Sequence, residues 1–363
     1  MNHATNQGIN QLIASSDPGR ISPKYLLRWT LRHLKKIKRL VFQFFTHCVD
    51  AGYDLYRYLR YSNAIYQSSG DRQKLETLLF FYYHKIEKAM ALPIVKPLFG
   101  LSYIETTLDL AEKWARNTND VEAVVFRGAY AALAQYQNQV QPALSQSRPD
   151  IALRLNRFLV DYENPNQEPG LGGTVEVFYG EDTEFLHDIN FEQLVRHRHS
   201  IRNFIKKPVP DSAIMQAVKI AQRTPSVCNR QCWRVHVFTS PADKAKILQY
   251  QNGNEGFGHL ADRVILITAD LRGFLSSGER HQATIDSGMF AMTLILALEA
   301  QGIVSCCLNL CFSAFEENAF RRESGISRWE VPIMLIVIGY PPEHLQVAIS
   351  ARKTTESMLT FHG

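Results

Sequence analysis

The stretch TIDSGMFAMTLILALEAQG, residues 284–302, is a long apolar segment with the length and composition of a buried helix. It lies between two runs rich in Val and Ile, DRVILITAD (262–270) and VPIMLIVIGYP (331–341), and β-branched residues favour strands. Upstream, the strand-like run WRVHVFTS (233–240) follows a second helix-like segment, DSAIMQAVKIAQRT (211–224). Strands interleaved with helices indicate an α+β or α/β domain of the kind found in enzymes.

The segment ENPNQEPGLGG, residues 163–173, ends a different pattern, because Asn, Pro and Gly replace the apolar periodicity that precedes it. Before this break, apolar residues recur every three or four positions, which is typical of helices. We therefore expect a polar, disordered start at 1–20, an all-helical region at 21–162, a linker at 163–190 and the C-terminal domain at 191–363.

Composition excludes several classes of protein. A length of 363 residues exceeds the roughly 250–300 residues at which single cores stop growing, so more than one folded part is expected. A net charge of +5 is mild for this length and gives no support for nucleic-acid binding. The polar N-terminus lacks the apolar core of a signal peptide, and no apolar run is long enough to span a membrane. We expect a cytoplasmic protein.

The six cysteines do not form the dense framework of a small secreted domain, which also indicates a reducing compartment. Cys228 and Cys232 lie at helical spacing, as do Cys307 and Cys311. Neither pair has a nearby second pair of His or Cys residues, so we expect no metal site.

Residues 24–45, KYLLRWTLRHLKKIKRLVFQFF, predict a helix with one apolar face and one strongly basic face. This segment contains no acidic residue. Two interpretations remain open: the helix lies at the surface of an anionic membrane, or it packs on its own protein with its charges in water. The cations are Lys24, Arg28, Arg32, Lys35, Lys36, Lys38 and Arg39.

The sequence HKIEK, residues 84–88, offers a second pair of alternatives. On a helix, His84 and Lys88 share a face with Glu87 beside them, as in an acid–base or anion site. The same spacing also describes an ordinary lattice of exposed charges.

The sequence RHRHSIRNF, residues 196–204, concentrates positive charge. It is either a solvated basic surface or a site for one particular anion. In an extended segment, alternate residues face the same side, so Arg198, Ser200 and Arg202 can act together. The planar guanidinium of Arg binds oxyanions with two parallel hydrogen bonds, which suits a phosphate.

Five segments of the C-terminal half, in order, resemble the nitroreductase family of FMN-dependent oxidoreductases. RHSIRNF (198–204) is similar to the family's Arg-x-Ser-x-Arg opening, and TPSVCNRQCW (224–233) to its Pro-Ser-x-x-Asn-x-Gln-Pro-Trp segment. DSGMFAMTLILALEAQGIVSC (286–306) resembles the long core helix. VIGYP (337–341) and ARK (351–353) resemble the closing strand and basic tail. The resemblance implies an α+β fold, a mixed sheet flanked by helices.

The resemblance also implies FMN as the cofactor, held at the interface of a homodimer. Arg198 would grip the phosphate and Ser200 would hydrogen-bond the flavin. Arg202 would lie at the pyrimidine end of the ring system, near N1 and the C2 carbonyl. Arg352 and Lys353 would complete the phosphate grip.

Two further segments carry implied cofactor contacts. Pro225, Ser226 and Asn229 would reach the flavin from the partner subunit. The backbone near Asn309 and Leu310 would hydrogen-bond flavin N5, so that no side chain need donate a proton. In this chain a cysteine stands where the family usually has the proline of its Gln-Pro-Trp motif.

The function implied is two-electron hydride transfer from NADH or NADPH to a small organic acceptor by a ping-pong mechanism. Flavin-dependent oxidation of a bound substrate is an alternative, and a non-catalytic, membrane-associated flavin sensor is another. The stretch HKIEKAMALP…LFG (84–100) resembles a nitroreductase-like subgroup associated with bacterial cell-surface polysaccharide gene clusters. In that case the location is the cytoplasm or the inner face of the membrane, and the helical region can form a lid over the flavin cleft.

Overall fold

The computed structural model describes residues 23–61, 72–96, 98–164, 171–179, 190–274 and 277–363. The predicted disordered start at 1–20 lies outside these residues. The contacts of the chain divide it into two units, residues 1–65 and 66–363.

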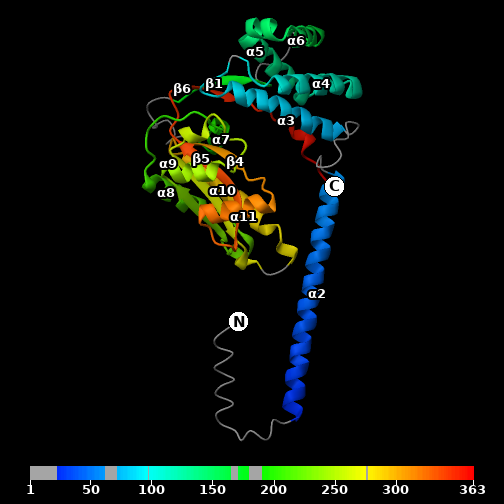
Figure 1. Cartoon of the computed structure of the whole chain (residues 1–363), viewed down its shortest axis with the longest axis vertical. Helices are drawn as coiled ribbons and strands as arrows, with labels where there is room; N and C mark the ends of the chain where they lie inside the picture. Colours follow the sequence, from blue (N-terminus) through cyan, green and yellow to red (C-terminus); the bar gives the residue numbers. More distant parts are fainter. Residues whose placement is uncertain (1–22, 62–71, 97, 165–170, 180–189, 275–276) are drawn as a thin grey trace. The chain divides into compact units, whose positions relative to one another are not determined.

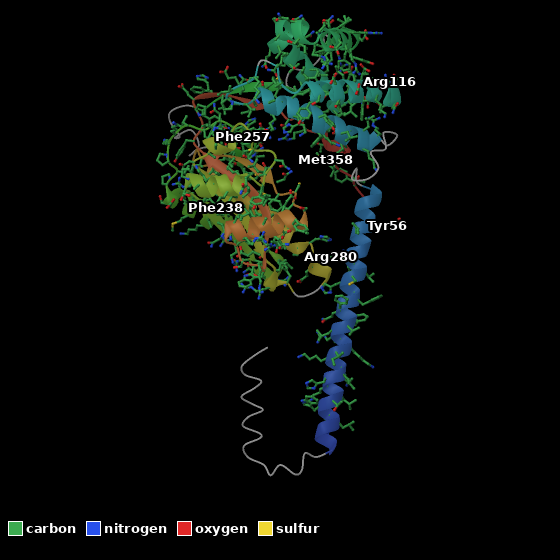
Figure 2. The ribbon with its side chains drawn as sticks, viewed as in Figure 1. Tyr56, Arg116, Phe238, Phe257, Arg280 and Met358 are labelled. Carbon is green, nitrogen blue, oxygen red and sulfur yellow. The ribbon has the colours of Figure 1, made fainter. Side chains whose placement is uncertain are left out.

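The first unit contains one long helix, α2 (Pro23–Tyr61), which includes the basic segment predicted at 24–45. Its side chains stand out along the length of the helix (Figure 2). Leu27, Leu31, Leu34, Ile37 and Val41 are all exposed. Among the described residues, no helix combines the length and the apolar character that crossing a membrane requires.

The second unit begins with helices that pack on one another around a core of its own. Phe126, Leu133 and Tyr136 are fully buried in this core, and so are Leu79 and Trp114. The helices are α3 (Arg72–Met90), α4 (Leu101–Thr118), α5 (Val124–Ser147) and α6 (Pro149–Asp161) (Figure 1). The described part of the predicted helical region is therefore helical.

A four-stranded sheet follows, in the order β2-β3-β5-β4, and every ladder in it is antiparallel. Its parallel element is a bridge between Ser200 and Ser305, where Ile201 N donates to Ser305 O at 2.9 Å. The strands are β2 (Trp233–Phe238), β3 (Arg263–Asp270), β4 (Val304–Asn309) and β5 (Glu330–Gly339).

Helices cover both faces of this sheet, because the central strands are apolar on both sides. In β3, Ile265 and Ile267 pack with α8 and α10, whereas Val264 and Leu266 pack with α9 and α11. This confirms the predicted α+β fold and its buried helix, which is α10. The helices are α8 (Asp211–Ala221), α9 (Pro241–Leu248), α10 (Gln282–Glu299) and α11 (Ala314–Ser324) (Figure 1).

Two short strands tie the tail of the chain to the helices. β1 (Thr174–Phe178) pairs antiparallel with β6 (His344–Ala348), and β6 contacts α3. β1 lies within the predicted linker, and α7 (Phe191–His197) leads into the basic cluster. Short 3-10 turns occur at Val227–Asn229, Gly258–Leu260, Leu271–Gly273, Ser277–Glu279 and Thr355–Ser357.

Candidate functional site

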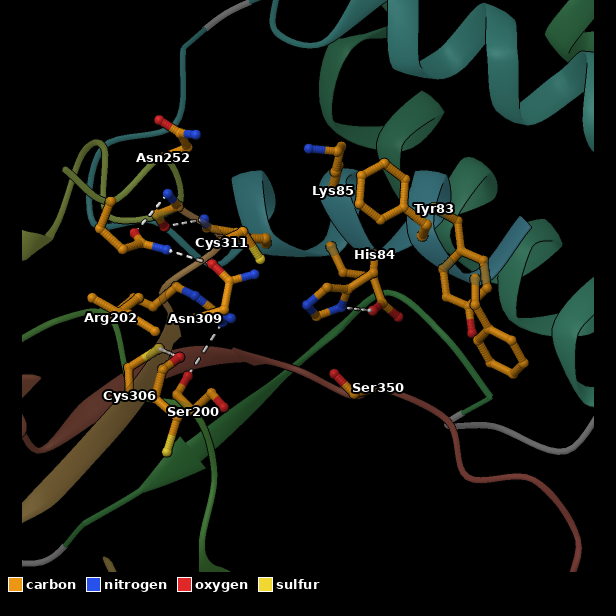
Figure 3. Close-up of a pocket in the computed structure, with 18 of the residues that line it drawn as sticks. Tyr83, His84, Lys85, Ser200, Arg202, Asn252, Cys306, Asn309, Cys311 and Ser350 are labelled. Carbon is orange, nitrogen blue, oxygen red and sulfur yellow. Dashed lines mark hydrogen bonds and ion pairs between the residues drawn. The ribbon is translucent and has the colours of Figure 1, made fainter. Parts of the chain in front are cut away.

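A pocket of about 860 Å³ opens between α3 and the edge of the sheet at β4, inside the second unit. Small-molecule sites span roughly 300–1,000 Å³, so this pocket can hold a large ligand. Figure 3 shows its residues converging from several elements. α3 supplies one wall; the segment after α7, the end of β4 and the tail around residue 351 supply the others.

Arg202 is a buried cation in this pocket, with only 7% of its surface exposed. One guanidinium nitrogen donates to Ser200 O at 3.2 Å, and no residue in the described part of the chain hydrogen-bonds Nε. Among the described residues, no carboxylate forms an ion pair with Arg202. The guanidinium also lies over the Phe257 ring, 5.9 Å from its centroid. Burying a charge without an anionic partner costs roughly several kcal/mol, so this environment favours an electron-rich or anionic ligand.

A second cation stands near it. Lys88 Nζ, on α3, donates to Gly253 O. Burial lowers the pKa of Lys88, and the positive charge of Arg202 lowers it further. A second cation beside Arg202 strengthens the case for an anionic ligand in this pocket.

The end of β4 is held by a loop that follows α9. Gln251 is buried, and its Nε2 donates to Asn309 Oδ1 at 3.1 Å. Gln251 Oε1 in turn accepts from Gly253 N at 2.6 Å. These bonds fix the position of Asn309 at the pocket wall.

The α3 wall carries an ordered acid–base pair. Glu87 is fully buried; its Oε2 lies 3.0 Å from Nδ1 of His84, and its Oε1 accepts from Gly173 N at 3.0 Å. The His84 side chain is 42% exposed and lines the pocket. The structure thus favours the site interpretation of HKIEK over a lattice of exposed charges.

Two adjacent cysteines of β4 also line the pocket. Burial raises the pKa of Cys306, and burial together with Cys306 raises the pKa of Cys307 to about 11. Cys307 nevertheless reaches solvent. At neutral pH both are thiols, which are poor nucleophiles.

Of the residues implied by the resemblance, Ser200, Arg202, Asn309 and Arg352 meet in this pocket. The pocket therefore brings together residues from near the start and near the end of the C-terminal domain.

Arg198, Leu310 and Lys353 are not among the residues that line the pocket. Arg198 is half-buried just after α7, and Leu310 packs against the sheet core. Lys353 forms an ion pair with Glu76 of α3.

Pro225, Ser226 and Asn229 lie on the loop around Val227–Asn229, which does not line the pocket either. Ser226 Oγ accepts from Gln231 N at 3.0 Å, and Val227 N donates to the buried carboxylate of Asp286 at 3.1 Å. These hydrogen bonds within the chain fix the conformation of the loop, which lies outside the pocket.

Gln251 and Gly253 do not stand out in the sequence as residues of a site. The loop QNGNEGFG (251–258) is rich in Asn and Gly, and that composition was the available signal for a functional turn. The contact of this loop with Asn309 is decided by tertiary structure alone.

Comparison with known proteins identifies the domain. The Nitroreductase family model matches residues 195–254 and 249–340. A candidate NAD(P)H nitroreductase of Bacillus subtilis, YodC, is 24% identical over 183 residues, which are 41% of this chain and 89% of the relative. An NADH dehydrogenase of Thermus thermophilus is 28% identical over 177 residues, 40% of this chain and 84% of the relative.

Among solved structures, a candidate nitroreductase of Desulfovibrio desulfuricans in complex with FMN superimposes with a TM-score of 0.40. It is 17% identical, over 48% of this chain and 98% of the neighbour. The family match covers the sheet, its helices and most of the domain's pocket wall. The C-terminal domain of this chain therefore matches the nitroreductase family and is of the nitroreductase type.

Proposed function

We propose that the chain binds FMN in the pocket and transfers a hydride from NADH or NADPH to a small organic acceptor. The observation that carries this proposal is Arg202, a buried cation that pairs with no carboxylate of the described residues and shares the pocket with Ser200 and Asn309. The electron-rich pyrimidine edge of a flavin supplies the acceptor atoms that Arg202 lacks. The relatives named above, an NAD(P)H nitroreductase and an NADH dehydrogenase, support the nicotinamide donor.

Each residue would have a defined task. Arg202 would bind the pyrimidine edge, Ser200 would add a hydrogen bond, and the backbone at Asn309 and Leu310 would orient the reactive part of the ring. Arg198, Arg352 and Lys353 would hold the phosphate. When bound, FMN would supply reversible uptake of two electrons as hydride.

We infer a ping-pong order, in which the nicotinamide and the acceptor occupy the same place in turn. The test is an absorbance spectrum of the purified protein, followed by anaerobic addition of NADH and then of NADPH. Flavin bands that bleach on addition support a reductase. Bands that persist redirect the assignment to an oxidase or a sensor, and a colourless protein that FMN does not reconstitute refutes the cofactor.

We also propose that the domain acts as a homodimer. Ile285, Met289 and Met292 are exposed on α10 at helical spacing, which leaves an apolar row on one face of the domain. A second copy on that face would bring the loop with Pro225, Ser226 and Asn229 to the partner's pocket. Light scattering should give a dimer, and Met289→Lys should give a monomer that loses FMN.

A further part of the proposal is that the protein is cytoplasmic and that α2 attaches it to the inner face of the membrane. Its exposed apolar residues and its cations suit an anionic lipid surface, where each cation contributes about 1 kcal/mol. The full-length protein should float with anionic vesicles and not with neutral ones. Leu34→Glu should abolish flotation, whereas the exposed control Gln43→Glu should weaken it slightly.

Finally, we propose that the reaction belongs to a bacterial cell-surface polysaccharide pathway. The support is the resemblance of residues 84–100, which form part of α3 and the turn after it. Loss of the gene should change the composition of the surface polysaccharide, and an unchanged composition refutes this assignment.

A further inference from the structure

The α3 wall holds a polar pair that the flavin site does not require. His84 and Glu87 come from outside the segment that the family model matches. They nevertheless line the same pocket as Ser200, Arg202 and Asn309. Figure 3 shows the His84 ring directed from α3 into the space it shares with Asn309 and Ser200.

Glu87 is held on both of its oxygens. One lies 3.0 Å from His84 Nδ1 and the other accepts from Gly173 N at 3.0 Å. Gly173 has φ +87°, and a Cβ there would lie 2.2 Å from Gln135 Oε1, so this position requires glycine. The turn at Gly173, before β1, therefore places a backbone N–H donor at the fully buried carboxylate of Glu87.

A carboxylate fixed in this way determines the state of the histidine. In neutral His84 the proton must sit on Nδ1, where it is donated to Glu87. Nε2 is then the atom that carries or releases the second proton, and no described residue hydrogen-bonds it. Because the ring is 42% exposed, Nε2 can exchange protons with water between turnovers.

We propose that His84 is the proton donor to the acceptor in this pocket and that Glu87 is its positioning residue; the proposal rests on the function proposed above. The acceptor used to test it is a quinone, a carbonyl conjugated to a double bond. Reduction of such a group forms a C–H or O–H bond with the hydride's electron pair and needs one proton at a second atom. The Nε2–H bond of the imidazolium breaks, its electron pair stays on nitrogen, and the proton completes the reduced product. The electron pair derives from NADH or NADPH, which is oxidised.

The charged surroundings are mixed. Glu87 is the acidic neighbour of His84, whereas the cations Lys88 and Arg202 line the same pocket. The other titratable groups that face the pocket are Tyr83, Lys85, Lys88, Arg202, Cys306, Cys307, Cys311 and Arg352.

The first test measures the histidine itself and needs no flavin. In protein labelled with ¹⁵N at histidine, the neutral His84 should show the Nδ1–H tautomer, opposite to the preference of free histidine. The His84→Gln variant assigns the signal. In Glu87→Gln the amide can donate to Nδ1, so the tautomer should switch. An Nε2–H tautomer in the unaltered protein overturns the proposal.

The second test compares two oxidants of the loaded enzyme, menadione and ferricyanide, of which ferricyanide takes electrons without a proton. His84→Gln should lower the ratio of the menadione rate to the ferricyanide rate by about 100-fold or more, the usual contribution of a general acid.

The matched control is His344→Gln, since His344 also lies near a glutamate, with Nδ1 3.6 Å from Glu176 Oε1, but outside the pocket. This control should leave the ratio unchanged. One outcome is that the enzyme binds FMN and that NADH or NADPH bleaches the flavin, while His84→Gln leaves the ratio of the menadione rate to the ferricyanide rate unaltered. In that outcome His84 is not the proton donor, and the proposed function still stands. If the protein does not bind FMN, the proposed function is refuted instead. The tautomer of His84 then still tests whether Glu87 positions the imidazole ring.

Discussion

Replacing Arg202 with methionine tests the pocket most directly, because the two states of the protein should respond in opposite directions. Without a ligand, Arg202 is a buried cation whose Nε has no hydrogen-bond partner among the residues that the structure describes. With FMN bound, the same guanidinium is expected to donate charge-assisted hydrogen bonds. Methionine keeps most of the length of the side chain and removes the charge.

The expected sizes follow from these contacts. Loss of hydrogen bonds from a charged group costs about 1.5–3 kcal/mol, which corresponds to a roughly 10- to 150-fold weaker affinity for FMN. In the flavin-free protein, removal of an unpaired buried charge should raise the free energy of unfolding by about 1–3 kcal/mol. The bond to Ser200 O, at 3.2 Å, is the only hydrogen bond of this side chain among the described residues, so its loss offsets little.

Affinity is measured by flavin fluorescence during titration of the flavin-free protein, and stability by urea unfolding of the same preparation. The matched control is Arg263→Met. Arg263 is also largely buried but is paired with Asp262 at 2.6 Å, outside the pocket. The control should lose stability and keep its affinity for FMN. If Arg202→Met binds FMN as tightly as the unaltered protein, or is destabilised like the control, the reasoning about the unpaired charge is wrong.

Three further predictions concern single positions. Gly173→Ala should lower the free energy of unfolding by more than about 1 kcal/mol in urea, because a positive φ and the contact with Gln135 both oppose a side chain; unchanged stability would contradict the turn geometry. Cys307 should be alkylated slowly at pH 8 and faster as the pH approaches its raised pKa of about 11, as followed by mass spectrometry of its peptide; rapid alkylation at pH 8 would refute this. Phe126→Ala should cost about 3–5 kcal/mol, since the ring is fully buried in the helical core; calorimetry of the thermal transition measures the loss.

The composition of the strands was sufficient to predict most of the fold. Runs such as DRVILITAD must be buried on both faces, so helices on both sides of the sheet could be expected before any coordinates. The buried helix was equally clear, because α10 is apolar around most of its circumference. The short strand β1 was not predicted, since its five residues follow a Gly-rich turn and gain their stability only by pairing with β6.

Residues of the site could be predicted where they lie close together in the sequence. Arg198, Ser200 and Arg202 stand in one short segment, and their alternation already indicated an anion site. The contribution of α3 could not be read from the chain in this way. HKIEK has the spacing of an ordinary exposed helix, and the burial of Glu87 depends on a backbone donor 86 positions away.

The sequence by itself determined the α+β domain, its helical N-terminal part and the basic residues suited to a flavin, because apolar periodicity and residue chemistry are local properties. Tertiary structure alone decided which residues share the pocket. It gave the buried Arg202 no counter-charge among the residues that the structure describes, and it placed Lys88 near it. It also brought Gly173 N to Glu87, which contacts His84. Burial, pairing and the direction of a side chain arise only when distant segments pack together, and these quantities set the chemistry of the site.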